Sequence, residues 1–258
     1  MKHIFTPVLL LVATGVILVN ECGAQSKFQK LVWSDEFNVP GAPDSVKWGY
    51  DIGTGFNGWG NNESQYYTNQ PGNVTVSDGT LKITARKEAF KDAAYTSARL
   101  SSKNKAEWMY GRIEARAKLP AGKGVWPAIW MLGANIDAVG WPSCGEIDIM
   151  EHVGRHLNKI YGTLHYPGFS GDNAVGGNVM IPDATTAFHR YAVEWDESAI
   201  KFFVDDVLYF TFKNGPSLPY NHKFYLIVNV AMGGNFGGAI DPAFANAVME
   251  IDYIRVYQ

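Results

Sequence analysis

Apolar and polar residues alternate with a period of two through much of the chain. Between residues 112 and 119, Ile113, Ala115, Ala117 and Leu119 alternate with four charged side chains. Successive side chains of a β-strand point to opposite faces, so this pattern predicts a strand with one buried face. The same pattern predicts further strands within residues 80–86, 189–195, 200–212, 223–232 and 248–257.

Turn residues separate these predicted strands, and few stretches of the sequence have a helical pattern. Asp205-Asp206 divides residues 200–212 into two strands of a hairpin, and Asp78-Gly79 precedes residues 80–86. Many short strands at regular spacing favour an all-β sandwich or jelly roll. We expect one domain over residues 25–258, with the Gly- and Asn-rich stretches 51–72 and 167–180 as loops at the rim of a cleft.

Residues 1–24 have a different composition from the rest of the chain. A basic start is followed by an apolar run and then small residues, which is typical of a secretory signal cleaved after Ala24. The alternatives are a membrane anchor, or a lipid attached to Cys22, for which Glu21 is a poor neighbour. We therefore expect a secreted or periplasmic protein with no membrane span in its mature part. Cys144 would then be the one remaining cysteine, so no intramolecular disulfide is expected.

Composition excludes several classes of function. The 258 residues contain 22 Lys and Arg against 25 Asp and Glu, a net charge of −3, which excludes a strongly basic nucleic-acid binder. Charged residues make up 18% and hydrophobic residues 47%, which excludes intrinsic disorder. Aromatic residues reach 14%, as in a large β core or in a cleft that stacks flat ligands.

The segment 141–154 contains three acidic residues and no Lys or Arg. A strand would point Glu146 and Asp148 to one face and the isoleucines beside them into the core. Glu151 reaches the acidic face only if one extra residue is inserted, so we predict a β-bulge around Ile149–Met150. The alternatives are a solvated strand face and a calcium cluster.

The spacing of the two glutamates suits a particular chemistry. Two Glu side chains that lean toward each other from this strand can bring their carboxyls to about 5 Å, the separation used in retaining glycoside hydrolysis. One would attack the anomeric carbon and the other would protonate the leaving oxygen. Asp148 between them can hold a shared proton and keep the two pKa values apart. The pattern leaves open which glutamate has which role.

This acidic segment, preceded by Trp126-Pro-Ala-Ile-Trp-Met-Leu-Gly133, resembles the family sixteen glycoside hydrolases. More narrowly it resembles their laminarinase-type branch, whose acidic strand carries the bulge. The resemblance extends over nearly the whole mature chain, through residues 33–37, 61–68, 98–102, 229–234 and 251–257.

The resemblance implies a concanavalin-like jelly roll of two antiparallel sheets with a glucan cleft on the concave one. It implies Glu146 as the nucleophile, Glu151 as the acid/base and Asp148 as the helper. It implies no cofactor for catalysis. A structural Ca²⁺ is implied on the convex side, with ligands at Glu36, the backbone carbonyl of Gly79, and Asp252.

Further residues are expected to bind sugar rings, whose flat faces stack on aromatic side chains. Trp59 lies in a Gly-Trp-Gly loop that suggests a platform at the rim. The resemblance adds Trp126 and Trp130 in the donor half, and Phe236 where many relatives carry Trp. It adds His165 near the acid/base, where it could orient Glu151 or bind the leaving sugar. It also adds three polar cleft positions: Asn61, Glu63 and Arg99.

Several of these residues could instead have a purely structural role. Arg99 could form a salt bridge to Glu63 instead of binding sugar hydroxyls, Trp130 could be a core residue, and His165 could be a buried core histidine. Cys144 could share the face of Glu146, although no nucleophilic role is needed for it.

We therefore expect a secreted, monomeric, retaining endo-β-glucanase acting on laminarin or mixed-linkage glucan. One rival is the same chemistry on a galactan such as agarose or porphyran. Sulfated polymers favour Lys or Arg on the cleft loops, and residues 51–72 and 167–180 contain none. The other rival is a non-catalytic glucan-binding lectin.

Overall fold

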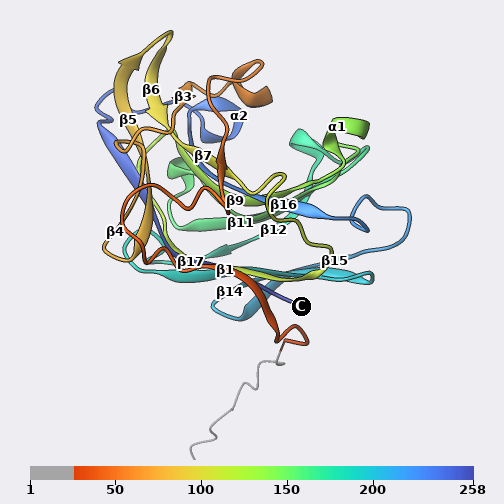
Figure 1. Ribbon diagram of the computed structural model, residues 1–258. Coiled ribbons are helices and arrows are strands. Elements are labelled where there is room, and N and C mark those ends of the chain that lie inside the picture. Colours follow the sequence, from red (N-terminus) through yellow and green to blue (C-terminus); the bar gives the residue numbers. More distant parts are fainter. Residues whose placement is uncertain (1–25) are drawn as a thin grey trace, which may run out of the picture.

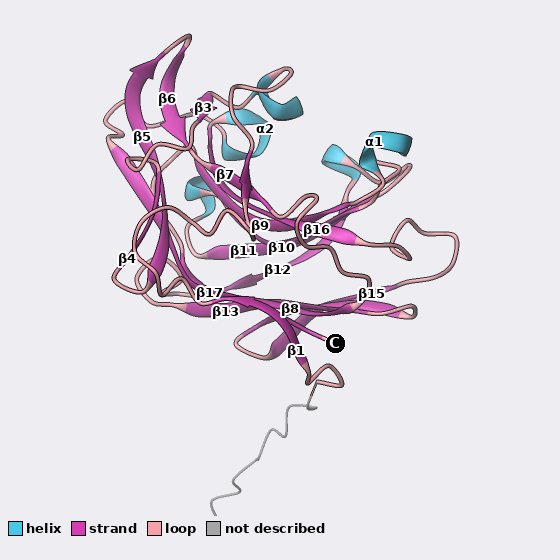
Figure 2. Cartoon of the chain, in the orientation of Figure 1, coloured by secondary structure: helices cyan, strands magenta, loops and turns pink. Residues whose placement is uncertain are grey.

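Two β-sheets packed face to face form the body of the protein (Figure 1). The computed structural model describes residues 26–258, so the predicted signal, 1–24, lies outside the described residues. Strands dominate, and helices occur only as short pieces between them (Figure 2). These are η1 (Gly58–Asn62), α1 (Ile136–Val139), η2 (Gly154–His156), η3 (Gly171–Asn173) and α2 (Gly234–Gly237). None of these helices is long and apolar enough to cross a membrane.

A ten-stranded sheet forms the outer layer. Its main path runs β15-β14-β13-β8-β17-β5-β6-β3, with β1 paired to β17 and β4 to β5. All pairs are antiparallel except β3 with β6. The strands are β1 (Leu31–Asp35), β3 (Gln65–Tyr67), β4 (Val74–Ser77), β5 (Thr80–Phe90), β6 (Ala93–Ser97), β8 (Gly111–Lys118), β13 (His189–Trp195), β14 (Ala199–Val204), β15 (Val207–Lys213) and β17 (Asn246–Tyr257).

A seven-stranded antiparallel sheet forms the other layer, in the order β12-β11-β10-β9-β16-β7-β2. Its strands are β2 (Gly49–Tyr50), β7 (Arg99–Ser101), β9 (Val125–Gly133), β10 (Glu146–His152), β11 (Lys159–His165), β12 (Val175–Met180) and β16 (Phe224–Met232). The acidic segment is therefore a central strand, β10. The two-sheet jelly roll predicted from the alternation is confirmed.

The core fills the space between the sheets. From β8 it takes Ile113, Ala115 and Ala117, which are the apolar positions of the predicted strand. From β10 it takes both isoleucines and Met150. The predicted hairpin is also present, because Asp205 and Asp206 join β14 to β15 with φ of 49° and 66°. Positive φ at both central residues is what a type I′ turn requires.

Two stretches predicted as irregular loops contain strands, which corrects those predictions. Within 51–72 lies β3, and within 167–180 lies β12. The sequence of β12 is rich in glycine and lacks clear alternation, because other chain segments approach it closely. A Cβ on Gly176 would lie 2.5 Å from the carbonyl oxygen of Gly162, and one on Gly177 would lie 2.6 Å from Cβ of Phe210. Only glycine fits there.

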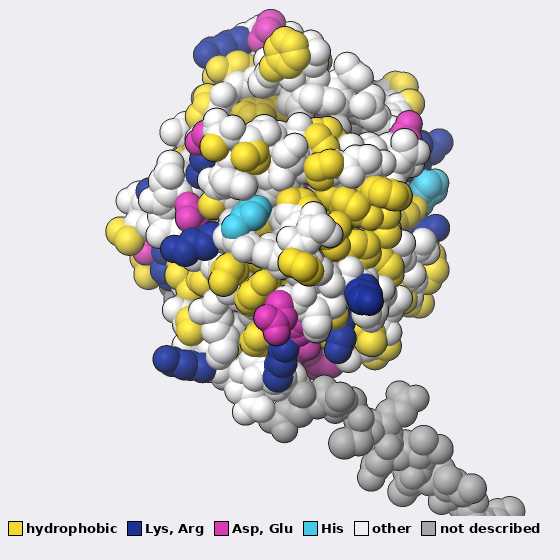
Figure 3. All heavy atoms as spheres, turned by 90° about the vertical axis from the view of Figure 1, so that its right-hand side faces the viewer, with side chains coloured by type: hydrophobic (Ala, Val, Ile, Leu, Met, Phe, Trp, Pro, Cys, Tyr) yellow, Lys and Arg dark blue, Asp and Glu magenta, His cyan; other side chains and the backbone are white. Residues whose placement is uncertain are grey.

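Surface charge is mixed on the face shown in Figure 3. Hydrophobic side chains gather there, with single positive and negative side chains scattered among them. This distribution accords with a net charge of only −3.

Candidate active site

A bulge in β10 brings the three acidic side chains to one face. On one side Asp148 pairs with Trp130, and Met150 with Ile129, so the register shifts between them. On the other side the shift falls between Asp148 and Glu151. The predicted bulge is confirmed. With Ile149 and Met150 both buried in the core, Glu151 joins Glu146 and Asp148 on the opposite face.

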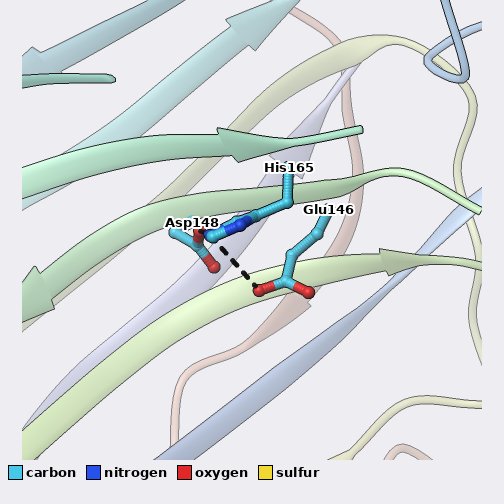
Figure 4. Close-up of side chains that lie close together, drawn as sticks. All are labelled: Glu146, Asp148 and His165. Carbon is cyan, nitrogen blue, oxygen red and sulfur yellow. Dashed lines mark ion pairs between the residues drawn. The ribbon is translucent and has the colours of Figure 1, made fainter. Parts of the chain in front are cut away.

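Glu146 lies at the start of β10 and is the most exposed of the three acids, with 16% of its side chain accessible. Its Oε2 accepts a hydrogen bond of 2.7 Å from the indole nitrogen of Trp141. Its Oε1 lies 3.9 Å from Nε2 of His165. Figure 4 shows Glu146, Asp148 and His165 turned toward one another.

Asp148 faces the His165 ring, with Nε2 at 3.2 Å from Oδ2. The backbone N–H of Gly171 donates to Nδ1 of the same ring, so a neutral His165 carries its proton on Nε2, toward the carboxylates. This corrects one expectation. His165 forms no hydrogen bond to Glu151 and instead lies beside Asp148 and Glu146, because β11 pairs residue 165 with residue 146.

Glu151 is oriented by two other donors. Its Oε1 accepts 3.1 Å from the indole nitrogen of Trp126, and its Oε2 accepts 3.0 Å from the hydroxyl of Thr163. Trp126 lies on β9 and Thr163 on β11, so the two neighbouring strands each supply one donor. Glu146 and Glu151 are thus held by separate partners on either side of Asp148.

Burial of three carboxyls with no Lys or Arg partner raises their pKa values. For Glu146, burial and then the charge of Asp148 raise the pKa to about 8. For Asp148, burial and the charge of Glu151 raise the pKa well above its usual range. Burial also raises the pKa of Glu151, against the lowering effect of the Thr163 hydroxyl. A raised pKa favours the protonated form of a carboxyl, which a general acid requires.

A cation–aromatic stack borders the acids on the side of β16 and β7. The Arg99 guanidinium lies 4.4 Å from the ring centre of Trp59 and 4.9 Å from that of Trp130. Arg99 does not form the alternative salt bridge to Glu63, because it pairs with Asp51 at 2.9 Å. Both tryptophans are partly exposed, so Trp130 is not a fully buried core residue.

Glu63 belongs to a buried polar network next to this stack. It accepts hydrogen bonds from Gln65, Tyr67 and Asn61, at 2.6, 3.1 and 3.4 Å. The network continues from Tyr67 to Asn229, whose side-chain oxygen accepts from the indole of Trp130 at 2.8 Å. Burial raises the pKa of Glu63. The network fixes Trp130 and leaves the partly exposed Asn61 and Glu63 at the cleft.

Phe236 lies near Glu151. Its ring meets the edge of Trp126 at 5.5 Å and of Tyr161 at 5.2 Å between centres. Trp126 is the residue that donates to Glu151, so this aromatic group and the acid belong to one site.

Cys144 packs on the cleft side with Leu132 and Tyr225, as its spacing from Glu146 suggested. Burial raises the pKa of the thiol to about 11, so it stays protonated at neutral pH and is inert as a nucleophile.

The predicted calcium ligands come together at one sheet edge but do not form a cation site. Asp252 lies on β17 between the stretch that pairs with β5 and the stretch that pairs with β1, so Glu36 and Gly79 are near it in register. Both carboxylates, however, pair with arginines: Glu36 with Arg255 at 2.8 Å and Asp252 with Arg116. The residues as arranged do not fit the ion, and calcium binding stays a prediction.

One group elsewhere has the donor spacing of a metal site. In the described chain, Glu146, Asp148 and His165 each offer a ligand atom within 4.8 Å of the others.

Sequence reasoning missed several residues of the site. Asn229 and Asp51 are distant in sequence from Trp130 and Arg99, the residues they hold, and no local pattern marks them. Trp141 is close in sequence to Glu146, but the strand pattern does not extend to it. Thr163 and Tyr161 had a signal: β11 alternates Lys159, Tyr161, Thr163 and His165 on the partly exposed face with buried residues between them.

Comparisons with known proteins agree with this geometry. Residues 61–255 match the family model of the glycosyl hydrolases family 16. A beta-glucanase from Rhodothermus marinus is 46% identical over 245 residues, covering 89% of this chain and 85% of that protein.

Solved structures agree as well. The laminarinase structure from R. marinus has a TM-score of 0.84 at 46% identity and covers 89% of this chain and 97% of that one. A LamA variant from Z. galactanivorans, in complex with laminaritriose and laminaritetraose, has a TM-score of 0.82 at 45% identity and covers 90% and 100%. The chain belongs to glycosyl hydrolase family 16, and it is a glycoside hydrolase.

Proposed function

We propose that this protein is a secreted, retaining endo-β-glucanase that cleaves internal β-1,3 bonds of laminarin or mixed-linkage glucan. One observation carries the proposal: the bulge of β10 puts two glutamates on one face, on either side of Asp148, each with its own donors. The names of the relatives, laminarinase and beta-glucanase, support the choice of polymer.

In this mechanism Glu146 is the nucleophile and Glu151 the acid/base. The Glu146 carboxylate attacks the anomeric carbon while Glu151 gives its proton to the leaving glycosidic oxygen, so the C–O bond breaks and a glycosyl-enzyme ester forms. Glu151, now ionised, takes a proton from water as the water attacks the same carbon, and Glu146 leaves. Two inversions at that carbon retain its configuration.

Asp148 and His165 support the first step. Burial and the charge of Asp148 raise the pKa of Glu146 to about 8, so its proton must move before it can attack. Asp148, whose pKa burial raises well above its usual range, can hold that proton. The Nε2 hydrogen of His165 and the indole hydrogen of Trp141 both favour the ionised nucleophile.

The remaining predicted residues would hold the glucan. Trp130, Trp126 and Trp59 offer aromatic surface for sugar rings, and Arg99, Asn61 and Glu63 offer polar groups for hydroxyls. Phe236 would border the leaving sugar because it contacts Trp126, which donates to Glu151 and so lies on the acid/base side rather than in the expected donor half.

The test incubates purified protein with laminarin, mixed-linkage glucan and agarose, and measures new reducing ends. Proton NMR of the first product then reports the anomer, and a β-product is the expected result of retention. E146Q serves as the matched inactive control. Turnover of agarose alone would replace the glucan by a galactan. Binding of laminarin without turnover would instead indicate a lectin.

Export and monomeric state are also part of the proposal. Expression in a bacterial host with fractionation should place the protein outside the cytoplasm, with a mass lower by residues 1–24. Gel filtration with light scattering should give one chain per particle. Retention of the full mass in the cytoplasm would contradict export.

A further inference from the structure

A group of basic side chains lies where the cleft continues beyond Glu151. They come from the connection between β10 and β11 and from the first residue of β11: Arg155, His156 and Lys159. We call these three the basic rim. The basic rim lies outside residues 51–72 and 167–180, the two stretches without Lys or Arg that favour a neutral substrate.

Strand geometry directs part of the basic rim toward the substrate. Along β11 the partly exposed positions are Lys159, Tyr161, Thr163 and His165. Thr163 donates to Glu151, so this face is the cleft face. Lys159 shares it, with its ammonium 5.2 Å from the Tyr161 ring centre. Nδ1 of His156 lies 2.7 Å from the Tyr161 hydroxyl.

Arg155 is the arginine left without a carboxylate. Of seven arginines, six pair with Asp or Glu within 4.0 Å: Arg86, Arg99, Arg112, Arg116, Arg190 and Arg255. In the part of the chain that the structure describes, Arg155 has no such ion pair. Its guanidinium instead lies 5.6 Å from the ring centre of Phe236, which in turn contacts Trp126. A guanidinium without a carboxylate partner thus lies on the aromatic pair Phe236 and Trp126, which leads to Glu151.

The charges around the rim are few. The backbone of Lys123 packs against Gly154, where an added Cβ would lie 3.1 Å from the Lys123 nitrogen. Two acidic residues are nearby. Glu151 is already held by Trp126 and Thr163. The exposed Asp241 lies against the loop of Lys123, because its backbone amide donates to the Lys123 carbonyl. Arg155 and Lys159 thus bring two cationic side chains to the aromatic rings next to Glu151, although the whole chain carries a net charge of −3.

We propose that the basic rim binds an oxyanion substituent, a carboxylate or sulfate ester, on the leaving-side sugars of a β-glucan chain. The guanidinium of Arg155 offers a planar pair of donors that matches such a group, and Lys159 adds a point charge. Tyr161 and Phe236 provide the aromatic surface for the ring that carries it. This inference rests on the proposed glucanase function and names the substrate class more narrowly.

The experiment compares kcat/KM on neutral laminarin with that on partly carboxymethylated and partly sulfated laminarin of equal length. At low salt the native protein should favour at least one anionic form by about threefold, an effect the size of one or two exposed charge contacts. The preference should vanish at high salt because the charges are screened. The arm that responds distinguishes carboxylate from sulfate.

Variants assign the effect to the rim. R155Q and K159Q should each lower the ratio of anionic to neutral kcat/KM toward one. K201Q, which removes an exposed lysine from β14 of the other sheet, should leave that ratio unchanged. A native ratio of one or less, or a ratio that R155Q and K159Q leave intact, would overturn the inference.

A binding measurement separates this inference from the glucanase proposal. Affinity electrophoresis of the inactive E146Q variant should show tighter binding to anionic laminarin than to the neutral polymer. Absence of laminarin hydrolysis by the native protein would refute the glucanase proposal alone. Equal or weaker retardation by the anionic polymer would refute the basic rim's role even where laminarin is cleaved.

Discussion

The outer face of the ten-stranded sheet and the cleft face of the seven-stranded sheet both present carboxylates at alternate strand positions. On the outer face, Arg112 pairs with Glu114 at 2.6 Å, with Glu194 at 3.0 Å and with Asp206 at 2.6 Å. On the cleft face, the three acids of β10 receive indole and hydroxyl hydrogens and one imidazole, and no Lys or Arg.

This difference separates structural from chemical use of the same side chains. A paired carboxylate stays ionised, and its charge stabilises the fold. An unpaired buried carboxylate has a raised pKa and can accept and donate protons near neutral pH. A surface cavity is not enough to identify the active site. A cavity of about 530 Å³ borders Arg112 and its carboxylate partners, and no residue of β10 lines it. The missing counter-charges mark the active site.

The largest expected effect comes from neutralising a cleft glutamate. E146Q and E151Q should each lower kcat on laminarin by about 10³-fold or more, because nucleophile and proton donor have no substitute. E114Q makes the same change on the outer face and should leave activity within about twofold. Initial rates and thermal melts of the three variants test this. Equal losses in E114Q and E146Q would remove the distinction between the faces.

Two neighbours of Glu146 should move its pKa in opposite directions. The nucleophile acts ionised, so activity rises as pH passes through its pKa. D148N removes a charge that raises this pKa, and should shift the acidic limb of kcat/KM to lower pH, with about 10²-fold lower activity. W141F removes a donor that lowers the pKa, and should shift the limb to higher pH, with about tenfold loss.

The pH dependence of kcat/KM for both variants provides the check. Shifts of the same sign, or none, would show that charge and hydrogen bonding at Glu146 do not control the acidic limb.

Substitutions on the outer face should lower the free energy of unfolding rather than the activity. R112M leaves Glu114 and Glu194 without their cation, and Glu114 is buried, so the free energy of unfolding should fall by about 3 kcal/mol. R190M breaks an exposed pair with Asp206 and should cost about 1 kcal/mol or less. Urea unfolding measures both. Activity per folded molecule should stay unchanged in each, and a lost activity in R112M would contradict the structural role.

Calcium should have the smallest effect. Binding at Glu36 and Asp252 would displace Arg255 and Arg116 from both carboxylates. We therefore expect excess calcium to stabilise the protein by about 1 kcal/mol or less, a rise of a few degrees in Tm at most. D252N should abolish that rise and leave the chelator-treated Tm nearly unchanged. A rise that persists in D252N would place the ion elsewhere.

Much of the fold could be predicted from alternation, because a strand's period of two is a local property of the chain. Residues 112–119, 189–195 and 200–212 form strands at nearly the predicted bounds. The bulge was predictable for the same reason: an odd spacing between Asp148 and Glu151 puts both on one face only with an inserted residue. The resemblance then supplied the roles that spacing left open.

Local sequence patterns were enough to predict most strands, the acidic strand with its bulge, and the resemblance to the family. Tertiary structure alone decided the partners of those acids. Arg99 pairs with Asp51 rather than with Glu63, His165 faces Asp148 rather than Glu151, and Arg155 has no carboxylate partner among residues 26–258. Each outcome depends on segments brought together from distant parts of the chain. Periodicity acts over a few residues, whereas the charge balance around a buried group is set by whatever packs against it in space.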